Sequence, residues 1–184
     1  MKKNSGFTLV ELLVVVVVVG ISFSLAVPSF QGMMARNRLA TQANDMLLAI
    51  TLARSEASRV GGTVSVQAAA PVTGDEWGEG WCVVEGNPGD CTGTVIRQFP
   101  ALSGISILKS VDDDANAGNW DTPRTSISFN GLGGLSTDNE IRVMDLCHEG
   151  QDGRRFQIAL IGRTKIWRQA EAGDPTPPAV QPSC

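Results

Sequence analysis

The sequence is poor in the residue types that most enzyme sites and nucleic-acid surfaces use. Its 184 residues include one histidine, His148, and no tyrosine. A histidine-based catalytic triad would therefore have a single possible base. Neither a G-x-S-x-G nor an H-E-x-x-H motif occurs, so we expect no enzymatic activity, no cofactor and no small-molecule substrate. The formal net charge of −4 argues against a general nucleic-acid binder, which usually carries a basic excess.

The four cysteines do not cluster as zinc ligands do, and none forms a C-x-x-C pair. An even number of cysteines in an exported chain favours disulfides, and four cysteines allow three connectivities. We predict a Cys82–Cys91 bond, which closes a short loop. We also predict Cys147–Cys184, which would tie the C-terminal tail to the rest of the chain. The first pair rests on proximity and the second largely on elimination.

A long apolar run lies near the N-terminus. Leu9 to Ala26 is 18 residues long and almost wholly apolar, and it follows a short segment with Lys2 and Lys3. As a helix this run would be about 27 Å long, close to the thickness of a bilayer core. The two lysines predict a cytoplasmic N-terminus by the positive-inside rule. The run is therefore a candidate membrane segment.

Three interpretations of this run compete. A secretory signal peptide cleaved after Ala26 and a plain signal anchor both leave Glu11 unexplained. A carboxylate inside an apolar helix costs a few kcal/mol in a membrane, so Glu11 is a functional candidate. A third interpretation, based on the residues around Glu11, gives this carboxylate a role.

The segment Gly6-Phe7-Thr8-Leu9-Val10-Glu11-Leu12-Leu13 resembles the class III signal of type IV prepilins and pseudopilins. The resemblance implies that a prepilin peptidase cuts between Gly6 and Phe7 and that Phe7 is then N-methylated. It also implies an assembly role for Glu11, the fifth mature residue, and a helix kink at Pro28, since proline removes a helical hydrogen bond. Glu11 lies one turn from the new amine of Phe7 and could pair with it within or between subunits.

Residues 29–60 have the pattern of an amphipathic helix. Apolar residues recur there at intervals of three and four, and Gly61-Gly62 predicts the helix end. Short strand candidates separated by turn residues follow. They are Thr63–Gln67, Trp81–Glu85, Val95–Phe99, Ile105–Leu108, Thr125–Phe129, Ile141–Leu146, Phe156–Ile161 and Thr164–Trp167. We therefore expect an α+β fold, a long N-terminal helix kinked at Pro28 and packed on an antiparallel β-sheet head.

The expected organisation has four parts. They are a leader peptide (1–6), a transmembrane and filament-core helix (7–28), an amphipathic helix (29–60) and a β-rich head (63–184) whose proline-rich tail starts at residue 174.

Several motifs after residue 50 resemble the GspH/FimT family of minor pilins and pseudopilins. They are Leu52-Ala53-Arg54-Ser55-Glu56-Ala57, Trp77-Gly78-Glu79-Gly80-Trp81, Ser126-Ile127-Ser128-Phe129-Asn130-Gly131-Leu132-Gly133 and Gly162-Arg163. The resemblance implies the type IV pilin fold, a long helix on two β-sheets, in a low-copy subunit that primes or caps a filament. The proline-rich tail and the terminal cysteine have no place in the family pattern.

A local basic stretch hides within the acidic total. Residues 154–168 contain five basic residues and no acidic one. Some FimT-like pilins that this chain resembles bind DNA through a Gly-Arg-x-Arg motif, and Gly162-Arg163-Thr164-Lys165 matches it except for the final lysine, which lacks the planar fork of arginine. The DNA-binding candidates are Arg154, Arg155, Arg163, Lys165 and Arg168. The alternative is a solvated hairpin or a subunit contact.

Two further segments are weak candidates for ligand sites. Asp112, Asp114 and Asn116 offer oxygen ligands for calcium, but the glycine is displaced from the EF-hand position and no downstream glutamate is in register, so a solvated acidic loop is favoured and no metal is expected. Gly131–Gly134 lacks the Lys-Ser/Thr ending of a phosphate loop, which favours a hairpin turn.

The sequence as a whole predicts a minor pilin that acts as a structural and assembly-priming subunit of a type IV pilus. Two alternatives are a minor pseudopilin of type II secretion and a DNA-binding pilin for DNA uptake. The expected partners are other pilins or pseudopilins, a prepilin peptidase, the inner membrane and, in the last alternative, DNA. We expect a single-pass inner-membrane protein with its head in the periplasm, later incorporated into an extracytoplasmic filament.

Overall fold

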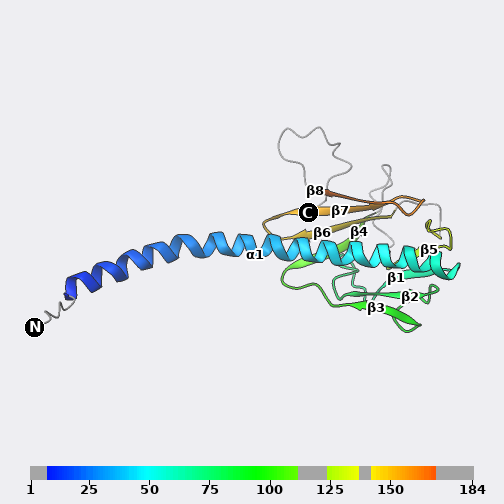
Figure 1. Ribbon diagram of the computed structural model, residues 1–184, viewed down its shortest axis with the longest axis horizontal. Helices are drawn as coiled ribbons and strands as arrows, with labels where there is room; N and C mark the ends of the chain where they lie inside the picture. The colour runs from blue at the N-terminus through cyan, green and yellow to red at the C-terminus, as the bar shows by residue number, and fades with distance from the viewer. Residues whose placement is uncertain (1–7, 112–123, 137–141, 169–184) are drawn as a thin grey trace, which may run out of the picture. The chain divides into compact units, whose positions relative to one another are not determined.

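The structure, a computed structural model, describes residues 8–111, 124–136 and 142–168. The chain divides into two compact units, Met1–Asn37 and Arg38–Cys184. Helix α1 (Leu9–Val60) belongs to both, and within the described residues it is followed by eight strands, β1 to β8. Figure 1 gives the order of these elements along the chain.

The first unit consists of the apolar part of α1. Thr8 caps the helix, since its side-chain oxygen accepts a hydrogen bond from the backbone N–H of Glu11 at 3.2 Å. An 18-residue window of the helix has a mean hydropathy of 2.7, and none of that window is buried within the molecule. The helix is long and apolar enough to cross a membrane. α1 continues through residue 28, so proline does not end it there, and the kink stays a prediction.

The second unit begins with the amphipathic part of α1. Its buried side chains recur at helical spacing, including Leu39, Met46, Ile50 and Ala57. Gly61 follows the last helical residue with φ of +65°, a conformation that glycine adopts without steric cost, and so provides the expected stop.

The strands form two four-stranded antiparallel sheets. Their bounds are β1 Val64–Ala68, β2 Trp81–Glu85, β3 Val95–Phe99, β4 Ser106–Val111, β5 Ser126–Phe129, β6 Arg142–His148, β7 Gln151–Ile158 and β8 Thr164–Arg168. The first sheet has the order β3-β2-β1-β5 and the second β4-β6-β7-β8. In Figure 1, β6, β7 and β8 of the second sheet carry the warm colours of the C-terminal part of the chain, whereas β4 is green.

One hydrophobic core joins α1 to both sheets. It contains Met46 and Ala53 from α1, Trp81 from the first sheet, and Leu146 and Phe156 from the second, all 1% exposed or less. Strand side chains alternate between the two faces of a sheet, so each of these strands presents every second residue to the core. The expected α+β architecture, a long helix followed by antiparallel sheets, is confirmed.

All eight predicted strands are present, but several of their boundaries differ. β6 ends at His148 rather than Leu146, and β7 ends at Ile158 rather than Ile161. β4 continues to Val111 rather than ending at Leu108, and β7 begins at Gln151 rather than Phe156. The start of β7 contains Asp152-Gly153-Arg154-Arg155, which has the composition of a turn. Pairing with β6 holds this polar segment in the sheet despite its weak strand propensity.

A loop before β2 closes the free edge of β4. The Asp75 and Glu76 carboxylates accept hydrogen bonds from the backbone N–H groups of Leu108 (2.7 Å) and Ser110 (2.9 Å). The backbone N–H of Trp77 in turn donates to the carbonyl of Leu108 at 3.1 Å. The loop therefore takes the place of a further strand and blocks this edge from pairing with another chain.

Candidate functional site

The five basic residues of the predicted DNA-binding cluster do not share one surface. Arg154 lies opposite Arg168 across β7 and β8, whereas Arg155 lies opposite Trp167. Because Arg154 and Arg155 are consecutive strand residues, their side chains leave the sheet on opposite faces. Arg163 lies in the turn before β8, one residue outside the strand. Only Arg163, Lys165 and Arg168 are exposed.

Arg155 is committed to a buried ion pair. Its Nε donates to Oδ1 of Asp145 and one terminal nitrogen donates to Oδ2, each at 2.7 Å. The Asp145 and Arg155 residues are only 0% and 7% exposed. Removing the guanidinium from this carboxylate would leave a buried charge uncompensated. The expectation that Arg155 contacts DNA phosphate is therefore not supported by its position.

Arg154 is half-buried on the core-facing side of β7. Its terminal nitrogen donates to the backbone carbonyls of Asp152 (2.9 Å) and Gly153 (3.0 Å). Burial, followed by repulsion from the charge of Arg168, lowers the pKa of the Arg154 guanidinium, and Asp152 partly offsets both. These contacts leave little of Arg154 for a ligand.

Arg163 and Lys165 remain accessible among the described residues. The Lys165 ammonium lies 5.3 Å from the ring centroid of Trp167, within the range of a cation–π contact. The accessible basic residues thus reduce to Arg163, Lys165 and Arg168. Lys165 and Arg168 leave β8 on opposite faces, so the three do not form a single surface.

Arg54 brings together three of the motifs that carry the family resemblance. From α1, its Nε donates to the carbonyl of Gly133 at 2.9 Å and a terminal nitrogen donates to the carbonyl of Ile161 at 3.2 Å. Gly162 has φ of +76°, and a Cβ there would collide with the Gly133 carbonyl oxygen. The Gly162-Arg163 motif therefore has a structural reason for its glycine, since the two turns touch at that point.

The processing and assembly residues lie at the start of α1. Gly6 and Phe7 are outside the described residues, so cleavage, methylation and the Phe7–Glu11 pair stay predictions. Glu11 is in the first helical turn, and Thr8-x-x-Glu11 has the spacing of a capping box. A carboxylate here also faces the positive end of the helix dipole. The helix terminus thus offers Glu11 favourable surroundings besides an amine.

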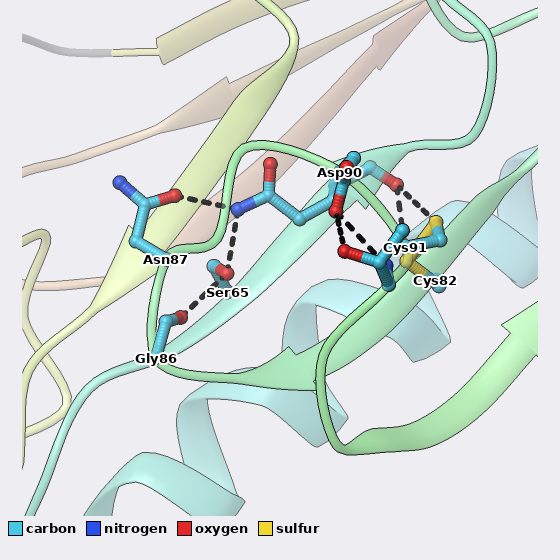
Figure 2. The surroundings of a disulfide bond; sticks show 8 residues. Ser65, Cys82, Gly86, Asn87, Asp90 and Cys91 are labelled. Atoms are coloured by element: carbon cyan, nitrogen blue, oxygen red, sulfur yellow. Dashed lines mark hydrogen bonds between the residues drawn. A yellow bond between two sulfur atoms is a disulfide. The ribbon is translucent and has the colours of Figure 1, made fainter.

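Cys82 and Cys91 form the disulfide expected from the sequence. Figure 2 shows the loop between them lying against β1, where the Ser65 hydroxyl donates to the carbonyl of Gly86 at 2.7 Å. The Gln67 side-chain amide nitrogen bonds to Asn87 from the same strand. The Cys82–Cys91 disulfide therefore holds this loop over the polar face of the first sheet. The second expected bond, Cys147–Cys184, includes a cysteine outside the described residues and stays a prediction.

The remaining candidates give no ligand site. Asp112, Asp114 and Asn116 lie outside the described residues. In the part of the chain that the structure describes, no group of three metal-ligating side chains is found. His148 is the last residue of β6, and its Nδ1 is 2.7 Å from the Ser106 hydroxyl. Asn130 and Gly131–Gly134 form a turn, in which the Asn130 side chain accepts bonds from two backbone N–H groups.

Sequence reasoning missed the roles of Arg54, Asp145 and the carboxylates that close β4. Arg54 lies in one of the motifs that carry the family resemblance, but its hydrogen-bond partners are 79 and 107 residues away. Asp145 lies between the apolar residues Met144 and Leu146 of β6, and a carboxylate at the centre of this strand was an available signal for a buried partner.

Comparison with known proteins places these features in context. The family model described as type II transport protein GspH matches residues 42–162. The model of the prokaryotic N-terminal methylation motif matches residues 1–27. No curated protein sequence matches this one.

Two crystal forms of a minor pilin share the fold. A crystal structure of the type IV minor pilin FimU from Pseudomonas aeruginosa has a TM-score of 0.57 at 21% identity, covering 72% of this chain and 90% of that chain. A second crystal form has a TM-score of 0.54 at 20% identity, with coverage of 70% and 92%. The minor pseudopilin EpsH from the type 2 secretion system of Vibrio cholerae has a TM-score of 0.47 at 13% identity, with coverage of 71% and 97%.

Proposed function

Because the chain belongs to the GspH family of minor pilins and pseudopilins, we propose that it primes the assembly of a type IV pilus as a low-copy structural subunit. A minor pilin or pseudopilin of the type IV pilus or type II secretion class is a membrane-anchored filament subunit that assembles with other pilins. The choice of the pilus, the priming role and the orientation of the head toward the periplasm are the parts that we propose.

The observation that carries the proposal is the unburied apolar half of α1. Large side chains there are open, among them Leu9 (80% exposed), Val16 (63%) and Phe23 (64%). So much apolar surface is stable only against lipid or against the helices of other subunits. An anchor that later becomes the packed core of a filament satisfies both situations in turn.

Glu11 supplies a register for that packing. In the apolar environment its charge is costly, and the free amine of Phe7 on an incoming subunit would offset part of the cost. A prepilin peptidase must first release that amine by cutting after Gly6. The expected cleavage and the assembly role are therefore linked in one mechanism.

Deleting the gene from its own bacterium tests the choice of machine. In a pilus subunit, deletion should reduce surface pili and twitching motility, while secreted enzymes reach the medium at normal levels. Re-expression of the intact chain should restore piliation. Normal piliation with a loss of secreted enzymes would instead support the alternative, a minor pseudopilin of type II secretion, because both machines use the same anchor and head.

DNA uptake is a second candidate, favoured by the exposure of Arg163 and Lys165. The full chain in detergent should be titrated with duplex DNA at low and moderate salt. If these side chains contact phosphate, changing both to Gln should weaken binding equally across sequences and flatten its salt dependence by about one unit of slope per lost contact. Arg59→Gln is a matched control, since Arg59 lies on α1 and pairs with Glu56. Absence of binding at low salt would exclude this candidate.

A further inference from the structure

The second sheet has a face directed away from the core. It carries the residues that alternate with the core-facing ones, and we call it the outer face. It includes Ile107, Lys109, Val143, Asp145, Cys147, Arg155, Gln157, Lys165 and Trp167. Lys109, Asp145, Arg155 and Trp167 lie opposite one another in one row across the four strands.

The central residues of the outer face are as buried as the core. Val143, Asp145 and Cys147 on β6 are 4%, 0% and 6% exposed, while the core-facing Met144 and Leu146 between them are 2% and 0% exposed. An antiparallel sheet with one face in water leaves its outward residues open. The exclusion of water from β6 and β7 therefore requires a cover on this side.

The buried Asp145–Arg155 ion pair also requires that the outer face be covered. Asp145 and Arg155 satisfy each other with two hydrogen bonds of 2.7 Å. A pair in open solvent would be hydrated and screened, whereas this one is sealed. Apolar Val143 lies beside this ion pair on the same face, and removing its side chain from water is energetically favourable.

We propose that the outer face is the docking surface for residues 169–184 of this same chain, fixed there by a Cys147–Cys184 disulfide. The segment leaves directly from the end of β8, which is two strands from β6. That distance is about 10 Å, while 16 extended residues span up to about 50 Å. This segment contains Cys184, and Cys147 lies on the outer face.

Charge and composition favour this occupant. The segment contains Glu171 and Asp174 and no lysine or arginine. Besides the Asp145–Arg155 ion pair, the outer face carries the basic residues Lys109 and Lys165. The prolines of residues 169–184 are Pro175, Pro177, Pro178 and Pro182. Proline lacks the backbone N–H that a ladder needs, so the segment is suited to crossing a sheet face rather than extending β8 as a further strand.

The docked segment would also narrow the surface open to other ligands. It would occupy the face to which Lys165 belongs and leave Arg163, in the turn, accessible. The inference concerns this chain alone and stands independently of the proposed function.

Two measurements on the full chain in detergent test the proposal. Peptide mapping without reduction should find Cys147 linked to Cys184, and a free Cys184 thiol would overturn the predicted attachment. The rate of maleimide labelling of Val143→Cys then shows whether position 143 on the outer face is covered. In the intact chain labelling should be slow. It should become several-fold faster when the chain ends at Arg168 with Cys147→Ser, because the buried position opens.

Met144→Cys is the matched control, since Met144 faces the core from the same strand. It should label slowly in both chains. If Val143→Cys also stays slow in the shortened chain, another segment covers the face and the proposal is wrong. If Met144→Cys becomes fast, the shortened chain has lost its fold. The decision then rests on the full-length chain with Cys147→Ser and Cys184→Ser, where faster labelling of Val143→Cys supports the docked tail and unchanged labelling overturns it.

Discussion

Arg54 shows how one side chain can hold distant parts of the head together. It joins α1 to the turn at Gly133 and the turn at Ile161 through two backbone carbonyls. A charged donor to two carbonyls is stronger than an ordinary hydrogen bond. The motif around Arg54 is therefore best understood as a structural clamp rather than as a ligand site.

We predict that Arg54→Met lowers the free energy of unfolding by about 1–2 kcal/mol, because two charge-assisted hydrogen bonds at a partly exposed site are lost. Urea unfolding of the full chain in detergent, followed by the fluorescence of the buried tryptophans, measures this. Arg59→Met is the control, since Arg59 makes only an exposed ion pair with Glu56, worth about 0–1 kcal/mol. Equal effects of the two changes would contradict the clamp.

Glu11 is the residue on which assembly should depend. Glu11→Val should still insert into the membrane, and more readily, because a charge has left the bilayer. Its incorporation into sheared filaments should fall, because the amine of Phe7 loses its partner. Immunoblotting of filament and membrane fractions compares the two pools. Val10→Ala, one residue away, keeps the carboxylate and should assemble normally, whereas full assembly of Glu11→Val would remove the pairing role.

At the level of elements, the loop before β2 binds backbone N–H groups at the free edge of β4. It does so with carboxylate oxygens, where a neighbouring strand would use carbonyl oxygens. Burial raises the pKa of the Asp75 carboxyl, the bond from the Leu108 N–H opposes this, and the charges of Glu76 and Glu79 add to the increase. The folded chain thus holds this proton more tightly than the unfolded chain does. The contribution of Asp75 to stability therefore falls as the pH rises from the ordinary value of 3.8 through the raised pKa.

We predict that Asp75→Asn, which keeps an oxygen acceptor for Leu108, makes the head more stable than the parent above the raised pKa. The difference should shrink as the pH falls below 3.8, where the parent carboxyl is protonated in both states. Urea midpoints from pH 3 to pH 7 provide the measurement. A greater loss of stability at pH 7 than at pH 3 would show that the charge itself holds the edge of β4.

Asp90→Asn serves as the opposite case. Hydrogen bonds from the Thr92 hydroxyl and then its N–H lower the pKa of Asp90. Its stabilising contribution is therefore present above 3.8 and is lost as the pH falls through the lowered pKa. Asp90→Asn should be the less stable chain at neutral pH.

For the whole molecule, export and processing decide which chain enters a filament. We predict that the mature protein lacks residues 1–6 and carries one added methyl group on Phe7. Loss of Lys2 and Lys3 takes the formal charge from −4 to −6. Intact-mass analysis of protein from the membrane fraction checks both changes, and cleavage after Ala26 would contradict the anchor.

The sequence by itself determined the features that depend on contiguous residues. The apolar run, the prepilin-like signal, the glycine stop after Val60, most strand positions and the Cys82–Cys91 pair all follow from local patterns. Periodicity and turn chemistry act over a few residues, so they can be read without knowing the fold.

Only the tertiary structure decided what the isolated charges do. Arg154 and Arg155 are neighbours in sequence, yet strand alternation sends them to opposite faces, and Asp145 on β6 takes Arg155 out of the basic surface. Arg54 likewise acquires its role from carbonyls 79 and 107 residues away. A charge can be assigned to a partner or to solvent only when sheet register places the two side by side, and no local pattern specifies that register.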